Sequence, residues 1–271
     1  MEHESSVADV RVRGKRPPQG DPVVDRAFAL LAAFDARHRT LGLGELARRS
    51  GIPTSSTLRL AGRLVAWGAL ERDAEGRFSI GLRLWEVASL APRAQGLKQV
   101  AMPYMGDLEE VTRQHVLLAV RDGDQGLLVE RLSSHLAMPV LYRVGGRLPL
   151  HSTGVGLVLL AHAEHEFQEE VLGRPLVHEP ERVAVSPAAL RRTLAAIRQD
   201  GLHVLRRRAP QPLVSVAAPV FGADDRIAAS LSVVVPQEHA EPRLLGPAVR
   251  TAARAISRGL GARRSIGLLD A

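Results

Sequence analysis

The chain has 271 residues, of which 45% are hydrophobic, so it can bury substantial cores and suits either one large domain or, as we expect, two smaller ones. The absence of cysteine excludes disulfides, cysteine-based zinc sites and thiol nucleophiles. The sequence has neither an apolar run of about 18 residues nor the core of a signal peptide, so we expect a cytoplasmic protein that is neither secreted nor membrane-embedded. The net charge of +7 suits a polyanionic partner, although a base-composition bias of the genome also raises arginine content.

The first quarter of the chain predicts three helices. Residues 1–20 are polar and contain Pro17 and Pro18, so they predict a disordered arm. Apolar side chains at helical spacing predict a helix over residues 23–34 and a short one from about residue 43. Gly51 favours a helix end and Pro53 a helix start, so a turn at 50–53 leads into a third helix over about 54–67.

A short hairpin follows the third helix. Residues 70–72 and 77–80 resemble strands, and residues 73–76 predict the turn between them. Three helices and a hairpin predict a winged helix-turn-helix domain over residues 21–82. Residues 22–84 hold ten arginines and six acidic residues, a net charge of +4, so positive charge is concentrated in this segment.

The third helix has two different faces. Thr57, Leu60, Ala61, Leu64 and Val65 share one face and are expected to pack, whereas Ser55, Arg59, Gly62 and Arg63 lie opposite. Small hydroxyls and long guanidinium groups suit a helix in the DNA major groove, and the arginines of the hairpin suit phosphates or the minor groove. The alternative is that these arginines only solubilise a three-helix bundle. The predicted DNA contacts are Arg26, Thr54, Ser55, Ser56, Arg59, Arg63, Arg72 and Arg77.

The remainder predicts a linker and an α+β domain. A helical pattern over 83–100, interrupted by Pro92 and Gly96, predicts a linker helix whose apolar face pairs with a second subunit. A new helix is expected after Pro103, and strands over 115–120, 126–131 and 138–144. Helices over 153–162 and 187–199, strands over 213–221 and 226–235 and a final arginine-rich helix complete a domain over 101–263, followed by a tail, 264–271.

The chain resembles the IclR family of transcriptional regulators in several motifs that occur in the family's order and spacing. They include VDRA at 24–27, GELARRSGIP at 44–53, GRLPLHSTGVG at 146–156 and VAAPV at 216–220. The resemblance implies an N-terminal winged helix-turn-helix joined by a linker helix to a GAF-like α/β effector-binding domain. It further implies a homodimer or homotetramer that binds a double-stranded operator and responds to a small organic or aromatic acid. Thr54 and Leu58 depart from the family's usual residues, so the operator sequence is not implied.

The resemblance also implies where the effector binds. Backbone N–H groups at a helix start bind carboxylates, and serine hydroxyls add hydrogen bonds, although the same groups also serve as a helix cap and as satisfied strand hydroxyls. Leu205 and the arginines at 206–208 stand where relatives usually carry acidic residues, which favours a bulkier, more apolar ligand, or one whose acid meets an arginine; a pocket without a ligand is the alternative. The implied effector residues are Leu141, Leu148, Gly154, Val155, Leu205, Ser215 and Ser232.

Two other functions compete with an effector-responsive regulator. An enzyme is disfavoured because Leu159 replaces the third glycine of a dinucleotide fingerprint and no Gly-x-Ser-x-Gly elbow occurs. His162 and His165 suit a surface helix end better than a metal site, so no metal, cofactor or catalytic residue is expected. The second alternative is a DNA-binding protein whose C-terminal domain only oligomerises. Whether the protein represses or activates transcription is left open.

Overall fold

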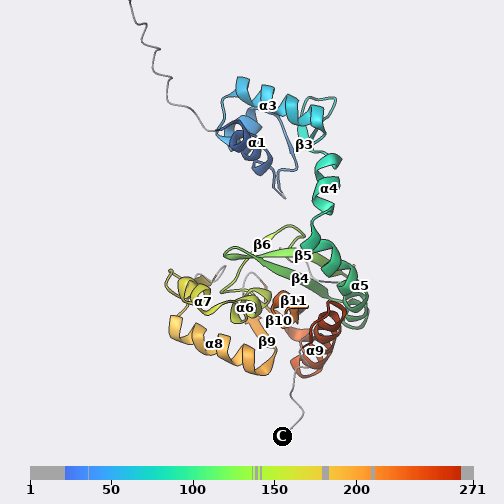
Figure 1. Cartoon of the computed structure of the whole chain (residues 1–271), viewed down its shortest axis with the longest axis vertical. Helices are drawn as coiled ribbons and strands as arrows, with labels where there is room; N and C mark the ends of the chain where they lie inside the picture. The colour runs from blue at the N-terminus through green and yellow to red at the C-terminus, as the bar shows by residue number, and fades with distance from the viewer. Residues whose placement is uncertain are drawn as a thin grey trace, which may run out of the picture. The chain divides into compact units, whose positions relative to one another are not determined.

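The computed structural model describes residues 22–35, 37–135, 137, 140, 142–178, 183–208 and 211–263 (Figure 1). The chain divides into two compact units, Met1–Ala91 and Pro92–Ala271, which are described separately. The predicted arm, 1–20, and tail, 264–271, lie outside the described residues. Among the helices of the described part, none has the length and apolar character needed to cross a membrane.

The N-terminal unit is a winged helix-turn-helix. Helices α1 (Val23–Ala32), α2 (Leu43–Ser50) and α3 (Thr54–Trp67) are followed by strands β2 (Leu70–Arg72) and β3 (Phe78–Ile80) and by helix α4 (Leu82–Ser89). The three predicted helices and the hairpin are confirmed. A further strand that was not predicted, β1 (Thr40–Leu41), pairs with β3 and makes a sheet of order β1-β3-β2. Two residues are too few to show a strand period, which explains why this strand was missed.

Local chemistry fixes the turn between α2 and α3. Gly51 caps α2 in the left-handed region, with φ of 70°, and its N–H donates to the carbonyl of Ala47. The buried Thr57 hydroxyl donates to the carbonyl of Ile52 at 3.1 Å, which ties α3 back to the turn. Leu30, Leu46, Leu60 and Phe78 close a common core beneath these elements.

A charged cluster joins α1 to α2. The Asp35 carboxylate accepts hydrogen bonds from the His38 ring at 2.9 Å, from the backbone N–H groups of Arg37 and His38, and from Arg49 at 2.5 Å. The hydrogen bond with His38 is the largest cause holding the pKa of Asp35 well below its usual range, and the backbone N–H groups and Arg49 act in the same direction. The cluster therefore stabilises the folded state when Asp35 is ionised.

Replacing Asp35 with asparagine is expected to lower stability at pH 7, and the difference from the wild type should shrink as the pH falls. Because folding depresses the pKa of Asp35, its contribution is complete above the unfolded value of about 3.9 and is lost as pH falls through the folded value. Urea unfolding between pH 7 and pH 2 measures this. Asp107→Asn, at an exposed position on α5 (Pro92–Thr112), serves as the control. A stability difference independent of pH would contradict the assignment.

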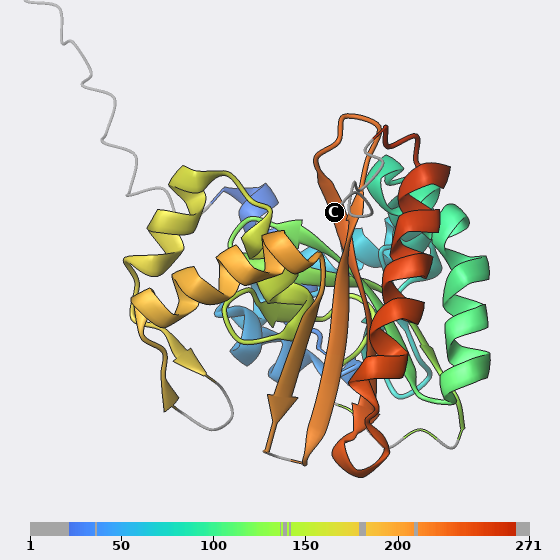
Figure 2. The same ribbon diagram turned by 90° about the horizontal axis from the view of Figure 1, so that it is seen from below.

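The C-terminal unit is built on a six-stranded antiparallel sheet of order β6-β5-β4-β11-β10-β9. One face is covered by α5 and α9, and the other by α6, α7 and α8 (Figure 2). Strands β7 and β8 form a separate pair. The bounds are β4 (His115–Asp122), β5 (Gln125–Ser133), β6 (Arg147–Pro149), α6 (Gly154–Ala161), α7 (His165–Leu172), β7 (Val177–His178), β8 (Val183–Ala184), α8 (Pro187–Asp200), β9 (His203–Arg207), β10 (Leu213–Phe221), β11 (Ile227–Pro236), the 3₁₀ helix η1 (Gln237–His239) and α9 (Pro242–Gly259).

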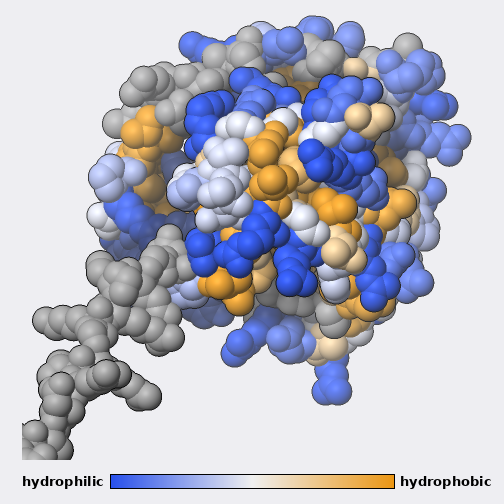
Figure 3. Space-filling view, turned by 90° about the horizontal axis from the view of Figure 1, so that it is seen from above, coloured by the Kyte–Doolittle hydropathy of each residue, from blue (hydrophilic) through white to orange (hydrophobic). Residues whose placement is uncertain are grey.

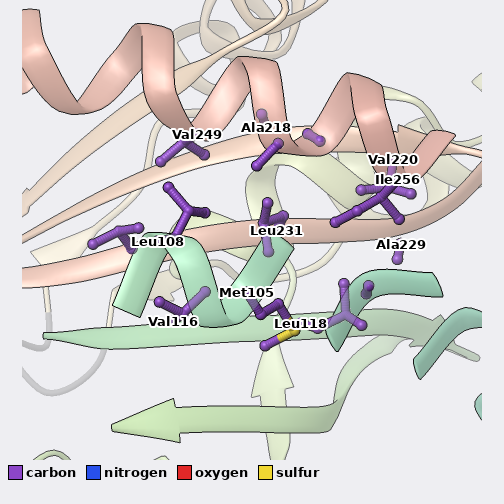
Figure 4. Close-up of a cluster of buried hydrophobic side chains, with 14 of the residues drawn as sticks. Met105, Leu108, Val116, Leu118, Ala218, Val220, Ala229, Leu231, Val249 and Ile256 are labelled. Carbon is purple, nitrogen blue, oxygen red and sulfur yellow. The ribbon is translucent and has the colours of Figure 1, made fainter. Parts of the chain in front are cut away.

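The central strands are buried on both faces. Leu118 and Leu231 point towards α5 and α9, where they meet Met105, Leu108 and Ile256 in the core shown in Figure 4. The neighbours of Leu118 in β4, Leu117 and Ala119, point to the opposite face, under α6, and belong to a second core with Val155 and Val158. This double burial follows from the period of two in a strand, and it explains why β10 and β11 are almost continuously apolar in sequence.

Two sequence expectations for this unit were wrong. No new helix begins after Pro103, because α5 runs through it, and the burial of Met105 and Leu108 offsets a cost of about 3 kcal/mol for an internal proline. The described residues of the expected strand 138–144, namely 140 and 142–144, do not form a strand. The next strand, β6, forms later in the chain, at Arg147–Pro149. The predicted linker helix 83–100 is divided between α4 and the start of α5.

Candidate nucleic-acid interface and effector site

Helix α3 separates its side chains as its sequence predicts. Thr57, Leu60 and Ala61 are buried in the core of the N-terminal unit, and Leu64 and Val65 pack against it. Ser55, Arg59, Gly62 and Arg63 are exposed on the opposite face. Seen from the end of the chain that carries α3, hydrophilic side chains surround a group of apolar ones (Figure 3). Leu58 is one of the large exposed apolar side chains of this helix.

The start of α3 has free hydrogen-bonding capacity. Its N-cap residue, Pro53, supplies no side-chain acceptor, so the N–H groups of the first turn face outward uncapped. Thr54 and Ser55 are exposed there and Ser56 is half-buried. Uncapped N–H groups together with the helix dipole attract an anion such as a DNA phosphate.

Arg26 lies beside the turn rather than on α3. It is half-buried on α1, and with Ser50, Gly51 and Pro53 it lines a hollow of about 280 Å³. Its Nε atom is buried and has no hydrogen-bond partner among the described residues. The guanidinium is therefore next to the uncapped start of α3, which suits the predicted phosphate contact.

The wing is less basic than the sequence analysis assumed. Arg77 pairs with Asp73 at 2.8 Å and with Glu75 at 3.3 Å, and these hydrogen bonds and charges raise the pKa of Arg77 above its usual value. Arg72 lies over the Phe78 ring and donates to the carbonyl of Gly76. With Glu71, the five charged side chains of residues 71–77 sum to −1. Arg77 is thus paired with two carboxylates, whereas Arg72 keeps its charge and is held in place by the Phe78 ring and the Gly76 carbonyl.

The predicted effector site begins where α6 meets β10. Thr153 caps α6 by accepting from the N–H of Gly156 at 3.1 Å. A Cβ atom added to Gly154 would lie 2.3 Å from the Ser215 hydroxyl, so only glycine fits this close approach. The N–H groups of Gly154 and Val155 belong to the first helical turn, where no intrahelical acceptor exists.

Strand register brings several predicted residues to the same face of the sheet. Ser215 pairs with Leu205 on β9, and Ser232 pairs with Ala217 on β10. Ser232 is fully buried, and its hydroxyl has no hydrogen-bond partner among the described residues. Leaving such a hydroxyl unsatisfied costs about 1–3 kcal/mol, so it marks a place for an acceptor or donor from a ligand or water. Gly154, Val155, Leu205, Ser215 and Ser232 therefore lie on the side of the sheet that α6 covers.

The two remaining predicted effector residues are Leu148 and Leu141. Leu148 is buried on β6, which pairs with β5 at the edge of the sheet opposite β9. It packs next to Gly126 in the core that also contains Val155 and Leu159 of α6. Leu141 lies outside the described residues.

The sequence analysis missed a tyrosine held by two arginines. Arg207 donates from Nη1 to the Tyr142 hydroxyl at 2.9 Å, and Arg131 donates to the Tyr142 backbone carbonyl. In the sequence, Arg207 stood out only as one of three arginines at positions where IclR relatives usually carry acidic residues. Its side chain follows Leu205 on the same face of β9, a strand that the sequence analysis did not predict.

His203 and His162 are half-buried in the C-terminal unit. Burial lowers the pKa of His203 to about 4, so this ring is neutral at pH 7. His162 packs its ring against Phe221 at 5.2 Å between centroids. Within the part of the chain that the structure describes, no three His, Cys, Asp or Glu side chains gather in a way that could hold a metal ion.

A winged helix-turn-helix with an exposed cationic helix, joined to an α+β unit with a polar site beneath a helix start, defines a transcriptional regulator of the DNA-binding, effector-sensing type. The chain belongs to the IclR family. Residues 91–258 match the "Bacterial transcriptional regulator IclR C-terminal" domain, and residues 23–74 match the "IclR helix-turn-helix domain". The resemblance stated from the motifs is thereby confirmed, and with it the α+β fold class.

Individual relatives agree with this assignment. An IclR homolog from Microbacterium hydrocarbonoxydans, whose crystal structure contains 4-hydroxybenzoate, is 35% identical with a TM-score of 0.83, over 88% of this chain and 99% of that one. HmgR of Pseudomonas aeruginosa is 28% identical with a TM-score of 0.72, over 88% and 97%. The transcriptional regulator XynR of Escherichia coli is 27% identical over 88% of this chain and 96% of its own length.

Proposed function

We propose that this chain is a non-enzymatic regulator that binds an operator in double-stranded DNA as a dimer, or a dimer of dimers. Helix α3 enters the major groove, and a small organic acid, aromatic in preference, binds under α6 and changes operator affinity. The observation that carries the proposal is the exposed face of α3, where Arg59 and Arg63 stand without a carboxylate partner among the described residues, next to an uncapped helix start.

The division of charge within the N-terminal unit supports α3 as the reading element. Arg59 and Arg63 are one helical turn apart and extend from the same exposed face, which suits bidentate contacts with guanine edges. Arg26 and the N–H groups of the first turn suit the adjacent phosphate. Arg72 and Arg77 would have to exchange their present partners for phosphates, so we assign them a smaller share of affinity.

Exposed apolar side chains within the N-terminal unit support dimerisation. Leu82 and Trp85 on α4 are 72% and 68% exposed and are three residues apart, so they form one stripe. Phe28 on α1 is 62% exposed. Large apolar side chains of this kind on a soluble protein typically mark an interface, and a symmetric pair of such units would match a near-palindromic operator.

The walls of the C-terminal site support an aromatic acid. Leu205, Leu213 and Tyr142 pack against the same core as Val155 and Ala217, so they supply apolar walls between the polar groups of the site. The Microbacterium hydrocarbonoxydans homolog binds 4-hydroxybenzoate, a flat acid of this kind. An apolar wall with a few polar groups at one end is the usual arrangement of a small-molecule site.

The DNA part of the proposal is tested by operator titration in fluorescence anisotropy. Arg59→Ala and Arg63→Ala are each expected to weaken specific binding about 5- to 150-fold, corresponding to loss of a base contact of about 1–3 kcal/mol. Arg192→Ala/Arg243→Ala removes two exposed arginines of the C-terminal unit and is the control for net charge. Repeating the titration with 4-hydroxybenzoate tests the coupling of the two units.

Two outcomes would overturn this proposal. If both α3 variants bind the operator like the control, α3 does not read the DNA. If no aromatic acid changes operator affinity or the melting temperature, the C-terminal unit has an oligomerising role instead of a sensing one.

A further inference from the structure

The site under α6 has a second polar end, formed by Tyr142 and Arg207. Arg207 pairs with Leu213 on β10. Leu213 stands two residues before Ser215 in this strand, so Leu213, Ser215 and Arg207 share one face of the sheet. Diagonal neighbours of this kind lie about 7–8 Å apart. Arg207 is therefore a diagonal neighbour of Ser215, on the side of Ser215 opposite to Ser232. Its side chain reaches the Tyr142 hydroxyl.

The hydrogen bond between these two residues has only one possible direction. Arginine has no acceptor, so the guanidinium of Arg207 donates and the Tyr142 oxygen accepts. The tyrosine hydroxyl consequently keeps its own hydrogen, and no acceptor for it is found among the described residues. Accepting from a charged donor polarises the phenol and makes it a stronger donor to a further partner.

The tyrosine is also positioned from its other end. Arg131 donates to the Tyr142 backbone carbonyl from β5, whereas Arg207 reaches the hydroxyl from β9. Strands β5 and β9 are separated by three strands in the sheet, so Tyr142 and the two arginines together bridge the face between them. Its ring packs with Leu205 and Leu213 against the second core. A tyrosine held at both ends presents its hydroxyl in one place.

We infer that the Tyr142 hydroxyl, oriented by Arg207, donates a hydrogen bond to a second oxygen of the effector, across the ring from the carboxylate that α6 and Ser215 bind. This inference rests on the proposed effector site and names the class of its ligand: an aromatic acid with a hydroxyl or second carboxylate at the far end. An acid without this oxygen leaves the Tyr142 donor without its ligand partner, and sites built to hydrogen-bond a polar group discriminate strongly against analogues that lack the group.

The next residue along β9 provides a matched control. Arg206 is exposed and points to the face opposite that of Leu205 and Arg207, because side chains alternate along a strand. Arg206→Leu therefore removes the same charge from the same strand without touching Tyr142. Tyr142→Phe removes only the hydroxyl and keeps the ring in the core.

Isothermal titration of the full chain with benzoate and 4-hydroxybenzoate tests the inference. The wild type and Arg206→Leu are expected to bind 4-hydroxybenzoate at least about tenfold more tightly than benzoate, whereas Tyr142→Phe and Arg207→Leu should bind both acids with similar affinity. Benzoate affinity itself should change little in Tyr142→Phe. Melting curves establish that each variant is folded, and Tyr142→Phe decides the result if Arg207→Leu is not.

The inference and the proposed function fail differently. If the wild type binds both acids equally, or if Tyr142→Phe retains the full preference, the role of Tyr142 is overturned and the effector site stands. If the wild type binds neither acid, the effector part of the proposed function falls together with the inference.

Discussion

Phe78→Ala is expected to destabilise the N-terminal unit by about 3–5 kcal/mol and to abolish operator binding. Phe78 is a fully buried side chain in the central strand of the small sheet, where it pairs with both Leu41 and Arg72. It also closes the core that contains Leu30, Leu46 and Leu60, so its removal leaves a cavity beneath α3 as well as beneath the wing. A loss of this size is comparable to the whole stability of a small domain.

The measurement is denaturant unfolding of the full chain, followed together with operator titration and calorimetric binding of an aromatic acid. Because Phe78 belongs to a core made only of N-terminal residues, acid binding by the C-terminal unit should persist in the variant. Ile80→Ala is the matched control, since Ile80 is in the same strand and is 41% exposed. Equal destabilisation by both substitutions would mean that the packing of Phe78 is not what holds the wing.

Gly154→Ala is expected to destabilise the C-terminal unit by about 1–3 kcal/mol and to abolish effector binding. The added Cβ would lie 2.3 Å from the Ser215 Oγ and 2.9 Å from its Cβ, so α6 would have to move away from β10. This movement displaces the N–H groups that are proposed to hold the carboxylate. Thermal melting and calorimetric titration with 4-hydroxybenzoate measure the two effects.

A second substitution separates packing from binding. Ser215→Gly removes both clashing atoms, and the next nearest neighbour, the Cβ of Ala217, lies at an ordinary 3.8 Å. The double variant should therefore regain most of the stability without regaining effector binding, because the serine hydroxyl is gone. Gly106→Ala is the control, since a Cβ there meets nothing within 4 Å. If Gly154→Ala alone binds the acid normally, the site is not at the start of α6.

The N-terminal unit was predicted from sequence almost completely because its signals are local. Gly51 and Pro53 mark the end of one helix and the start of the next through backbone conformation alone. The exposed face of α3 follows from the helical period, which assigned Arg59 and Arg63 to solvent. The charge of the wing was judged less well, because the ion pairs of Arg77 depend on how the turn folds.

The C-terminal unit was predicted less completely because its decisive contacts are distant in sequence. Strand β9 has the sequence HVLRR, which shows no apolar alternation, and it becomes a strand by pairing with β10 at the edge of the sheet. Helix α5 continues through Pro103 because of what it buries. Periodicity within a segment cannot show either effect, since both are decided by the neighbouring element.

The sequence by itself determined that the chain carries a winged helix-turn-helix, which side of α3 faces solvent, and to which family the chain belongs, because these rest on short-range spacing and on motifs in a constant order. The tertiary structure was needed to show that β9 closes the edge of the sheet and that Tyr142 meets Arg207. Residues 142 and 207 are 65 positions apart, and they are brought together by strand register and by the packing of a whole sheet.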